Sequence, residues 1–116
     1  DPVHCAMIEA LIVALKERFN ISVVIATHDL DLAARIADRV CLVKNGAVYA
    51  EGTPREVFYN TTLIEEAGLI LPGTVMTWLD YCKETGKEPV EQPITRGELV
   101  TLLGRRSREP TRKNLD

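Results

Sequence analysis

The run Ile21-Ser22-Val23-Val24-Ile25-Ala26-Thr27, followed directly by His28-Asp29-Leu30, decides the fold class of this chain of 116 residues. Its β-branched and apolar residues occupy consecutive positions instead of alternating with polar ones. This pattern is typical of a strand buried on both faces of a parallel sheet. Because such strands lie in the middle of α/β folds, residues 21 to 27 predict a central strand of an α/β domain.

The segment before this run predicts a helix. Asp1 followed by Pro2 is a helix-start signature, with an N-cap acceptor and proline at the first helical position, and the helix is expected from Val3 to Phe19. Its apolar residues spread well beyond one face, so the helix is expected to have neighbours on more than one side, not all of them within this chain.

The segment after the run continues an α/β rhythm. We expect a helix from Asp29 to about Ala37, strands over residues 39–44 and 47–51, and a type I′ turn at Asn45-Gly46, where both positions need positive φ. Thr53, Pro54 and Glu56 then form a capping-box start of a short helix that ends near Tyr59.

The remainder is expected to be helical. Helices are predicted over residues 62–67, where Gly68 ends the helix, and over residues 75–86. A third helix is predicted to begin at a second capping box, Thr95 to Glu98. Residues 87–93 form a polar connector. The predicted helix over residues 75–86 carries an apolar and aromatic group of side chains: Val75, Met76, Trp78, Leu79 and Tyr81. We expect this group to pack against the small carboxy-terminal helices, and the alternative is an exposed docking face.

Composition excludes several classes of protein. The chain is 46% hydrophobic and 27% charged, as in one soluble globular domain, and no apolar stretch has the ~18–20 residues of a spanning helix. Residues 105–116 hold five of the fourteen basic residues but two of the seventeen acidic ones, so the preceding 104 residues carry a net charge of −6. That balance disfavours binding to nucleic acid. Three widely spaced cysteines indicate a reduced compartment, each serving as a small hydrophobe: Cys5, Cys41 and Cys82.

His28 is the best candidate for chemistry. It follows the predicted strand and precedes a helix, which is where α/β folds place ligand contacts. Its imidazole can donate a hydrogen bond to a phosphate oxygen, or offset charge on a transferring phosphoryl group when protonated. The alternative is a structural histidine that caps or braces the following helix. A metal site at His4 with Cys5 or Asp1 is disfavoured, because adjacent helical residues point in different directions.

Four stretches together resemble the end of an ABC transporter nucleotide-binding domain: residues 23–30, 37–40, 44–48 and 51–58. Residues 27–33 (Thr-His-Asp-Leu-Asp-Leu-Ala) and 67–72 (Ala-Gly-Leu-Ile-Leu-Pro) are most similar to the cobalt and nickel type of energy-coupling-factor ATPases. The resemblance covers residues 1–72 well and is weak beyond Gly73. It implies a partial P-loop NTPase sheet over residues 1–72. Beyond it, the residue pattern predicts a small helical extension over residues 73–104, and the charged, apolar-poor composition predicts a basic, disordered tail over residues 105–116.

The resemblance also implies roles for two residues. Asp1 is similar to the end of the D-loop, at the interface between two ATPase subunits, and His28 to the switch histidine of the H-loop, which contacts the γ-phosphate of ATP. The implied parent is a membrane-associated, cytoplasmic subunit that uses ATP and Mg²⁺ and works with a second ATPase subunit and transmembrane transporter subunits. It would drive import of cobalt, nickel or a related micronutrient. No nucleic acid and no resident metal site are expected.

Three motifs of such ATPases do not occur in the sequence: a GxxxxGK[ST] phosphate loop, an LSGGQ-like signature, and an apolar strand ending in Asp-Glu. The chain is therefore expected to be an excised piece that does not hydrolyse ATP alone. Its predicted strand at 21–27 would lack parallel neighbours, so a dimer or strand exchange is expected.

Two other functions stay open. One is a non-enzymatic dimerisation or regulatory domain with a structural His28, and the other is a soluble ABC ATPase outside transport. Contact of the arginine-rich tail with anionic lipid headgroups is a further alternative to a solvated terminus.

Overall fold

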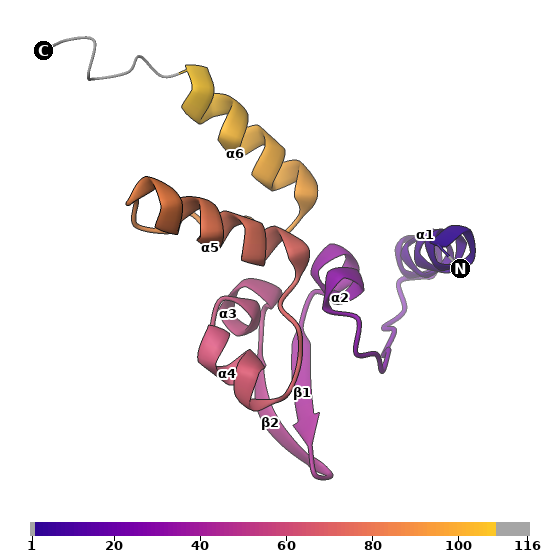
Figure 1. Cartoon of the computed structure of the whole chain (residues 1–116). Helices are drawn as coiled ribbons and strands as arrows, with labels where there is room; N and C mark the ends of the chain where they lie inside the picture. Colours follow the sequence, from indigo (N-terminus) through magenta and orange to yellow (C-terminus); the bar gives the residue numbers. More distant parts are fainter. Residues whose placement is uncertain (1, 109–116) are drawn as a thin grey trace, which may run out of the picture.

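The computed structural model describes residues 2–108, and within them it contains six helices and one hairpin (Figure 1). Asp1 and residues 109–116 lie outside the described residues. The elements in chain order are α1 (Pro2–Phe19), α2 (Leu30–Ile36), β1 (Val40–Lys44), β2 (Ala47–Gly52), α3 (Pro54–Phe58), α4 (Thr61–Glu66), α5 (Gly73–Thr85) and α6 (Arg96–Arg108).

The first helix is confirmed, with Pro2 at its first position, but none of its residues is buried. Large apolar side chains lie open along it, among them Val3, Met7, Ile8 and Leu11, each more than half exposed. Figure 1 shows α1 set apart from the other elements, which agrees with the expectation that its apolar surface needs partners beyond this chain.

The prediction of a buried central strand at residues 21–27 is wrong for this structure. Residues 20–29 are an irregular connection, Val24 is 97% exposed, and the sheet within residues 2–108 consists of β1 and β2 alone. A strand exists only where neighbouring strands satisfy its backbone N–H and C=O groups. The described residues place no strand beside this run, so its apolar side chains stay in solvent.

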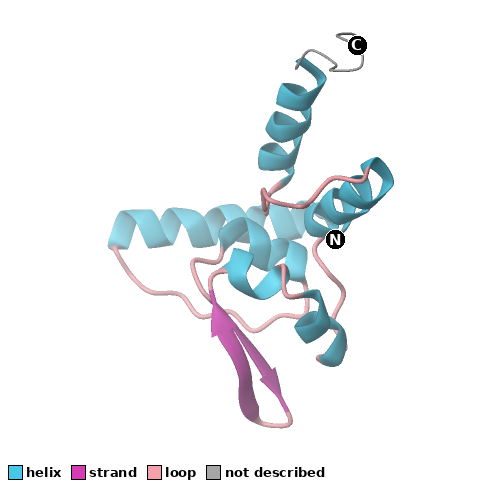
Figure 2. Ribbon diagram, turned by 90° about the vertical axis from the view of Figure 1, so that its left-hand side faces the viewer, coloured by secondary structure: helices cyan, strands magenta, loops and turns pink. Residues whose placement is uncertain are grey.

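The hairpin is confirmed. Strands β1 and β2 pair antiparallel, and the turn residues Asn45 and Gly46 both have positive φ, 53° and 76°, as a type I′ turn requires. The register shifts between Leu42 and Val43, because Leu42 pairs with Ala50 but Val43 with Val48, which leaves Tyr49 as a bulged residue. In Figure 2 the hairpin projects from one side of the helical body and α6 from the other.

A small core joins the hairpin to the helices around it. Phe58 of α3, Ile64 of α4 and Val75 of α5 are fully buried there. The remaining buried members come from α2, β1, α3 and the segment before α6: Leu30, Ala34, Val40, Leu42, Val57 and Ile94. The observed fold is thus a hairpin covered by short helices.

A second cluster joins α5 to α6 and confirms that the apolar face of α5 packs inward. Trp78 and Cys82 are buried against Leu99 and Leu102, with Tyr81 stacked on Trp78. Met76, by contrast, is 41% exposed. Helix α6 runs to Arg108, so the first four residues of the expected tail are helical, and its remainder lies outside the described residues.

Candidate functional site

His28 lies in a bend immediately before α2, and backbone contacts fix this bend on its helical side. The Asp29 N–H donates to Thr27 Oγ1 at 3.0 Å, and the Asp29 side chain accepts from Leu32 N–H at 3.1 Å. Asp29 is therefore the N-cap of α2, which satisfies one of the unpaired N–H groups of the first turn. The capped helix start determines where the residue before it sits.

The His28 side chain is exposed, and it makes no hydrogen bond or ion pair within residues 2–108. As the sequence predicts, it directly precedes a helix, but no formed strand leads into it. An exposed imidazole that is not engaged in bracing α2 is available to a ligand. Asp29 does the capping that the structural alternative had assigned to the histidine.

Helices α1 and α2 flank the connection that carries His28, and two ion pairs tie α1 to α2 and to the segment between α2 and β1. Arg35 Nε donates to both carboxylate oxygens of Glu9, at 2.9 and 3.1 Å, and Lys16 pairs with Asp38. The hydrogen bond that Arg35 donates to the Glu9 carboxylate raises the pKa of Arg35 above its ordinary value. Both pairs are surface contacts worth about 0–1 kcal/mol each, so α1 is held loosely.

One face of α1 is hollowed into a groove of about 470 Å³. Small residues form its floor and glutamates lie along it: Ala6, Ala10, Val13 and Ala14 with Glu9 and Glu17. Val13 on this face is exposed, and so are the large apolar residues of the connection that follows α1: Ile21, Val23, Val24 and Ile25. Several exposed large apolar side chains in one part of a chain are typical of a contact with another protein segment.

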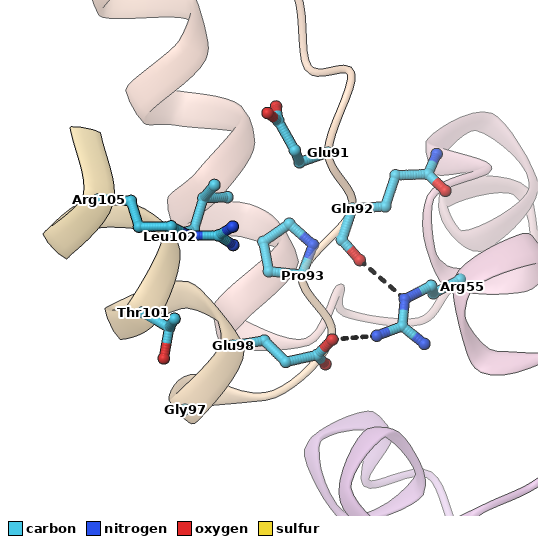
Figure 3. A pocket seen from close by; sticks show the side chains of 9 residues that line it. All are labelled: Arg55, Glu91, Gln92, Pro93, Gly97, Glu98, Thr101, Leu102 and Arg105. Carbon is cyan, nitrogen blue, oxygen red and sulfur yellow. Dashed lines mark hydrogen bonds and ion pairs between the residues drawn. The ribbon is translucent and has the colours of Figure 1, made fainter. Parts of the chain in front are cut away.

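A second hollow, of about 690 Å³, lies between α3, the connector at 87–93 and α6 (Figure 3). Arg55 points into it and is already engaged, because its guanidinium donates to the Gln92 carbonyl at 3.1 Å and pairs with Glu98. A cation paired in this way is a poor anchor for an added anion. We therefore interpret this hollow as a structural feature and not as a ligand site.

The connector itself is held by three side chains on three successive carbonyls. Trp78 Nε1 donates to Glu91 O at 2.7 Å, Arg55 Nε to Gln92 O, and the Tyr59 hydroxyl to Pro93 O at 2.6 Å. Burial raises the pKa of Tyr59 well above its ordinary value, so the hydroxyl keeps its donor proton at neutral pH.

Glu98 completes this arrangement as the capping box that the sequence predicts. Its Oε1 accepts from the N–H groups of Ile94 and Thr95, both at 3.2 Å, while the Glu98 N–H donates to Thr95 Oγ1. Burial alone would raise the pKa of this carboxyl, but the two backbone donors and then Arg55 hold the pKa of Glu98 below its ordinary value.

A contact that the sequence did not reveal joins α2 to α5. The Asp31 carboxylate accepts from the Gly73 N–H at 2.8 Å, across 42 residues of chain. No local sequence pattern indicates the distant partners of Asp31 or Arg55, so neither set of contacts was predicted from the sequence.

The other candidate residues do not assemble into a site. Asp1 lies outside the described residues, and within 2–108 no group of three or more histidine, cysteine or acidic side chains is placed to hold a metal. Cys5 and Cys41 are exposed, contrary to their expected use as small hydrophobes, whereas Cys82 is buried. Within residues 2–108, the His28 side chain could contact a phosphate of ATP. The same residues provide no cluster of oxygen ligands for Mg²⁺.

Comparison with known proteins gives the chain its relatives, although no family model matches it. It is 34% identical over 99 residues, 85% of its length, to the energy-coupling factor transporter ATP-binding protein EcfA of Methanocaldococcus jannaschii. It is 35% identical over 100 residues, 84% of its length, to a protein of Methanopyrus kandleri with the provisional name ABC transporter ATP-binding protein. EcfA1 of Listeria monocytogenes is 40% identical over 72 residues, 62% of the chain.

These alignments span only part of the relatives. They cover 36% of the Methanopyrus protein, 35% of EcfA and 25% of EcfA1, so the chain corresponds to about a third of the length of the first two. The resemblance drawn from residues 1–72 is confirmed at this level. Over that third, the chain is a homologue of ABC transporter ATP-binding proteins, those of energy-coupling factor transporters among them.

Proposed function

We propose that this chain provides the switch-histidine part of an ATP-hydrolysing, energy-coupling subunit of an ABC-type importer. The observation that carries the proposal is the alignment with EcfA over 85% of the chain. The geometry agrees with it, since His28 is exposed in a bend that Thr27 and Asp29 fix at the start of α2.

In this proposal the His28 imidazole contacts the γ-phosphate of bound ATP. A ring N–H donates to a phosphate oxygen, and the donor is useful only if its position is fixed before charge develops there. The capped start of α2 supplies that fixed position. ATP supplies the phosphoryl group and Mg²⁺ neutralises phosphate charge, while the residues that hold them belong to the part of the relatives that this chain does not span.

The exposed apolar surface of α1 and of residues 21–25 fits the same proposal. We propose that it packs against that remaining part, where residues 21–27 gain strand neighbours and join a larger sheet. Burial of apolar area provides the driving force, at about 25 cal/mol per Å². Asp1 is proposed to lie nearby, at the contact between two ATPase subunits.

The proposed partners follow from the same relatives. They are a second ATP-binding subunit and transmembrane transporter subunits, with this subunit on the cytoplasmic face of the membrane and cobalt, nickel or a related micronutrient as cargo. No helix within residues 2–108 has the length and apolar character to span a bilayer.

The test compares ATP hydrolysis by the complete ATP-binding subunit with that of the 116-residue chain. We expect His28→Ala to lower kcat of the complete subunit at least tenfold, and the matched substitution His4→Ala, of an exposed histidine on α1, to leave it within twofold. The chain alone is expected to release no phosphate. Unchanged turnover in His28→Ala, or steady phosphate release by the chain alone that His28→Ala abolishes, would overturn the proposal.

A second candidate is a dimerisation domain that uses the exposed face of α1 and residues 21–25 on another copy of itself. The observation that favours it is the same open apolar surface. Light scattering on the chain tests this second candidate, because it requires a specific dimer that Leu11→Glu dissociates, and a monomer at high concentration excludes it.

A further inference from the structure

The amino end of α5 has an unusual cap. The residue at its N-cap position is Pro72, whose side chain has no acceptor and which makes no side-chain cap. The first turn of a helix nevertheless leaves N–H groups without intrahelical partners. The Gly73 N–H, the first of these, is satisfied by the Asp31 carboxylate at 2.8 Å.

This cap comes from the helix that begins beside His28. Asp31 is the second residue of α2, and the same first turn is fixed by Asp29. The candidate phosphate contact His28, the helix cap Asp29 and the α5 cap Asp31 thus lie within four consecutive residues. The Asp31–Gly73 contact therefore links the helix start beside His28 to the start of α5.

From α5 the contacts continue to α6. Trp78, in the middle of α5, holds the connector through Glu91 O, and the connector leads into the capping box of Glu98 at the start of α6. Each link in this series is a hydrogen bond or a buried contact between helices. Packed side chains and hydrogen bonds in a continuous series of this kind can carry coupling between distant parts of a chain.

We propose that Asp31 is a positioning residue that couples the His28 bend to α5, and through α5 to the carboxy-terminal helix α6. The inference rests on the proposed function for the nature of the signal, which is occupancy of the site by ATP. The mechanical coupling itself depends only on the contacts given above.

The first experiment measures the coupling without nucleotide. Hydrogen exchange of the backbone amides at the start of α5 is followed in the 116-residue chain. In Asp31→Ala we expect exchange there about fivefold faster, since a lost helix cap has an effect of that order. Asp31→Asn, which keeps a side-chain oxygen acceptor, is expected to restore most of the protection, and Asp80→Ala, an exposed aspartate of α5, to change nothing.

A variant of the donor tests the same contact from the other side. Gly73→Pro removes the N–H, and its ring carbon Cδ takes the place of the hydrogen that faces Asp31 Oδ1. Proline is compatible with the first position of a helix, so this variant breaks the contact and is expected to speed exchange as Asp31→Ala does. Gly73→Ala is the control, because its Cβ would lie 3.6 Å from Asp31 Oδ1, an ordinary contact, and the N–H stays. Equal exchange in Asp31→Ala, Asp31→Asn and the wild type would overturn the inference.

The second experiment adds ATP and Mg²⁺ to the complete ATP-binding subunit and follows exchange over residues 73–85. We expect nucleotide to slow exchange in the wild type and in Asp31→Asn, and at least half of this effect to disappear in Asp31→Ala. An equal nucleotide effect in Asp31→Ala, or none in the wild type, would refute the coupling. The ATPase rate of His28→Ala tests the proposed function separately, so the two failures are distinguishable.

Discussion

The capping box at the start of α6 allows a quantitative prediction, because one carboxylate there serves four partners. Glu98 Oε1 accepts from the backbone N–H groups of Ile94 and Thr95 and from the Thr95 hydroxyl, each at 3.2 Å, and Oε2 pairs with Arg55. Glu98→Ala removes all four contacts at once. Glu98→Gln keeps an oxygen acceptor for the backbone donors and removes the charge.

The magnitude follows from these contacts. Loss of a helix-cap acceptor costs about 1 kcal/mol, and the pair with Arg55 adds at most about 1 kcal/mol, since both side chains are 40–49% exposed. We therefore expect the free energy of unfolding to fall by about 1–2 kcal/mol in Glu98→Ala and by at most about 1 kcal/mol in Glu98→Gln.

Denaturant unfolding of the chain, followed by fluorescence, measures both values. Trp78 is the single tryptophan of the sequence and is fully buried beside α6, so it reports on this cluster directly. The result that would refute the reasoning is an equal loss of stability in Glu98→Ala and Glu98→Gln, because the backbone acceptor would then contribute nothing.

The pH dependence gives a second check on the same residue. The pKa of Glu98 is lowered in the folded chain, so the folded state binds fewer protons than the unfolded state in this pH range. Its stabilisation is complete above the unfolded pKa of the carboxyl and disappears as pH falls through the folded pKa. Glu98→Gln is expected to flatten this acid dependence, and an unchanged profile would contradict the assignment.

Three further predictions concern the core, the turn and the thiols. Phe58→Ala, at a fully buried position, is expected to cost about 3–5 kcal/mol in denaturant unfolding. Gly46→Ala, at φ +76°, is expected to cost about 1 kcal/mol although nothing lies within 4 Å of its new Cβ, because the backbone conformation disfavours L residues. A thiol reagent is expected to modify Cys5 and Cys41 rapidly and Cys82 only on unfolding, and rapid modification of all three would place Cys82 outside the core.

Local chemistry explains which elements could be predicted from the sequence. Proline at the first position of α1, Asn45-Gly46 in the hairpin, Thr53 before α3 and the pair of Thr95 and Glu98 before α6 each act over a few residues. Such signals need no distant partner, so the structure confirms them nearly in place. The inward packing of Trp78 was also predictable from the helical spacing of its apolar neighbours.

The central strand expected at residues 21–27 is the element that the sequence predicted wrongly. Its composition is that of a buried strand, but a strand is a property of a sheet, and the neighbours that would hydrogen-bond to it are not among the described residues. The same absence of neighbours explains why α1 is apolar on several sides and buried on none.

The sequence by itself determined the helix starts, the hairpin turn, the position of His28 before a helix and the family to which its relatives point. Tertiary structure alone decided which distant groups meet: Asp31 with Gly73, and Arg55 with Gln92 and Glu98. The physical reason is range. Caps and turns are selected by atoms a few bonds away, whereas a carboxylate that caps a helix 42 residues later is placed by the packing of the whole core.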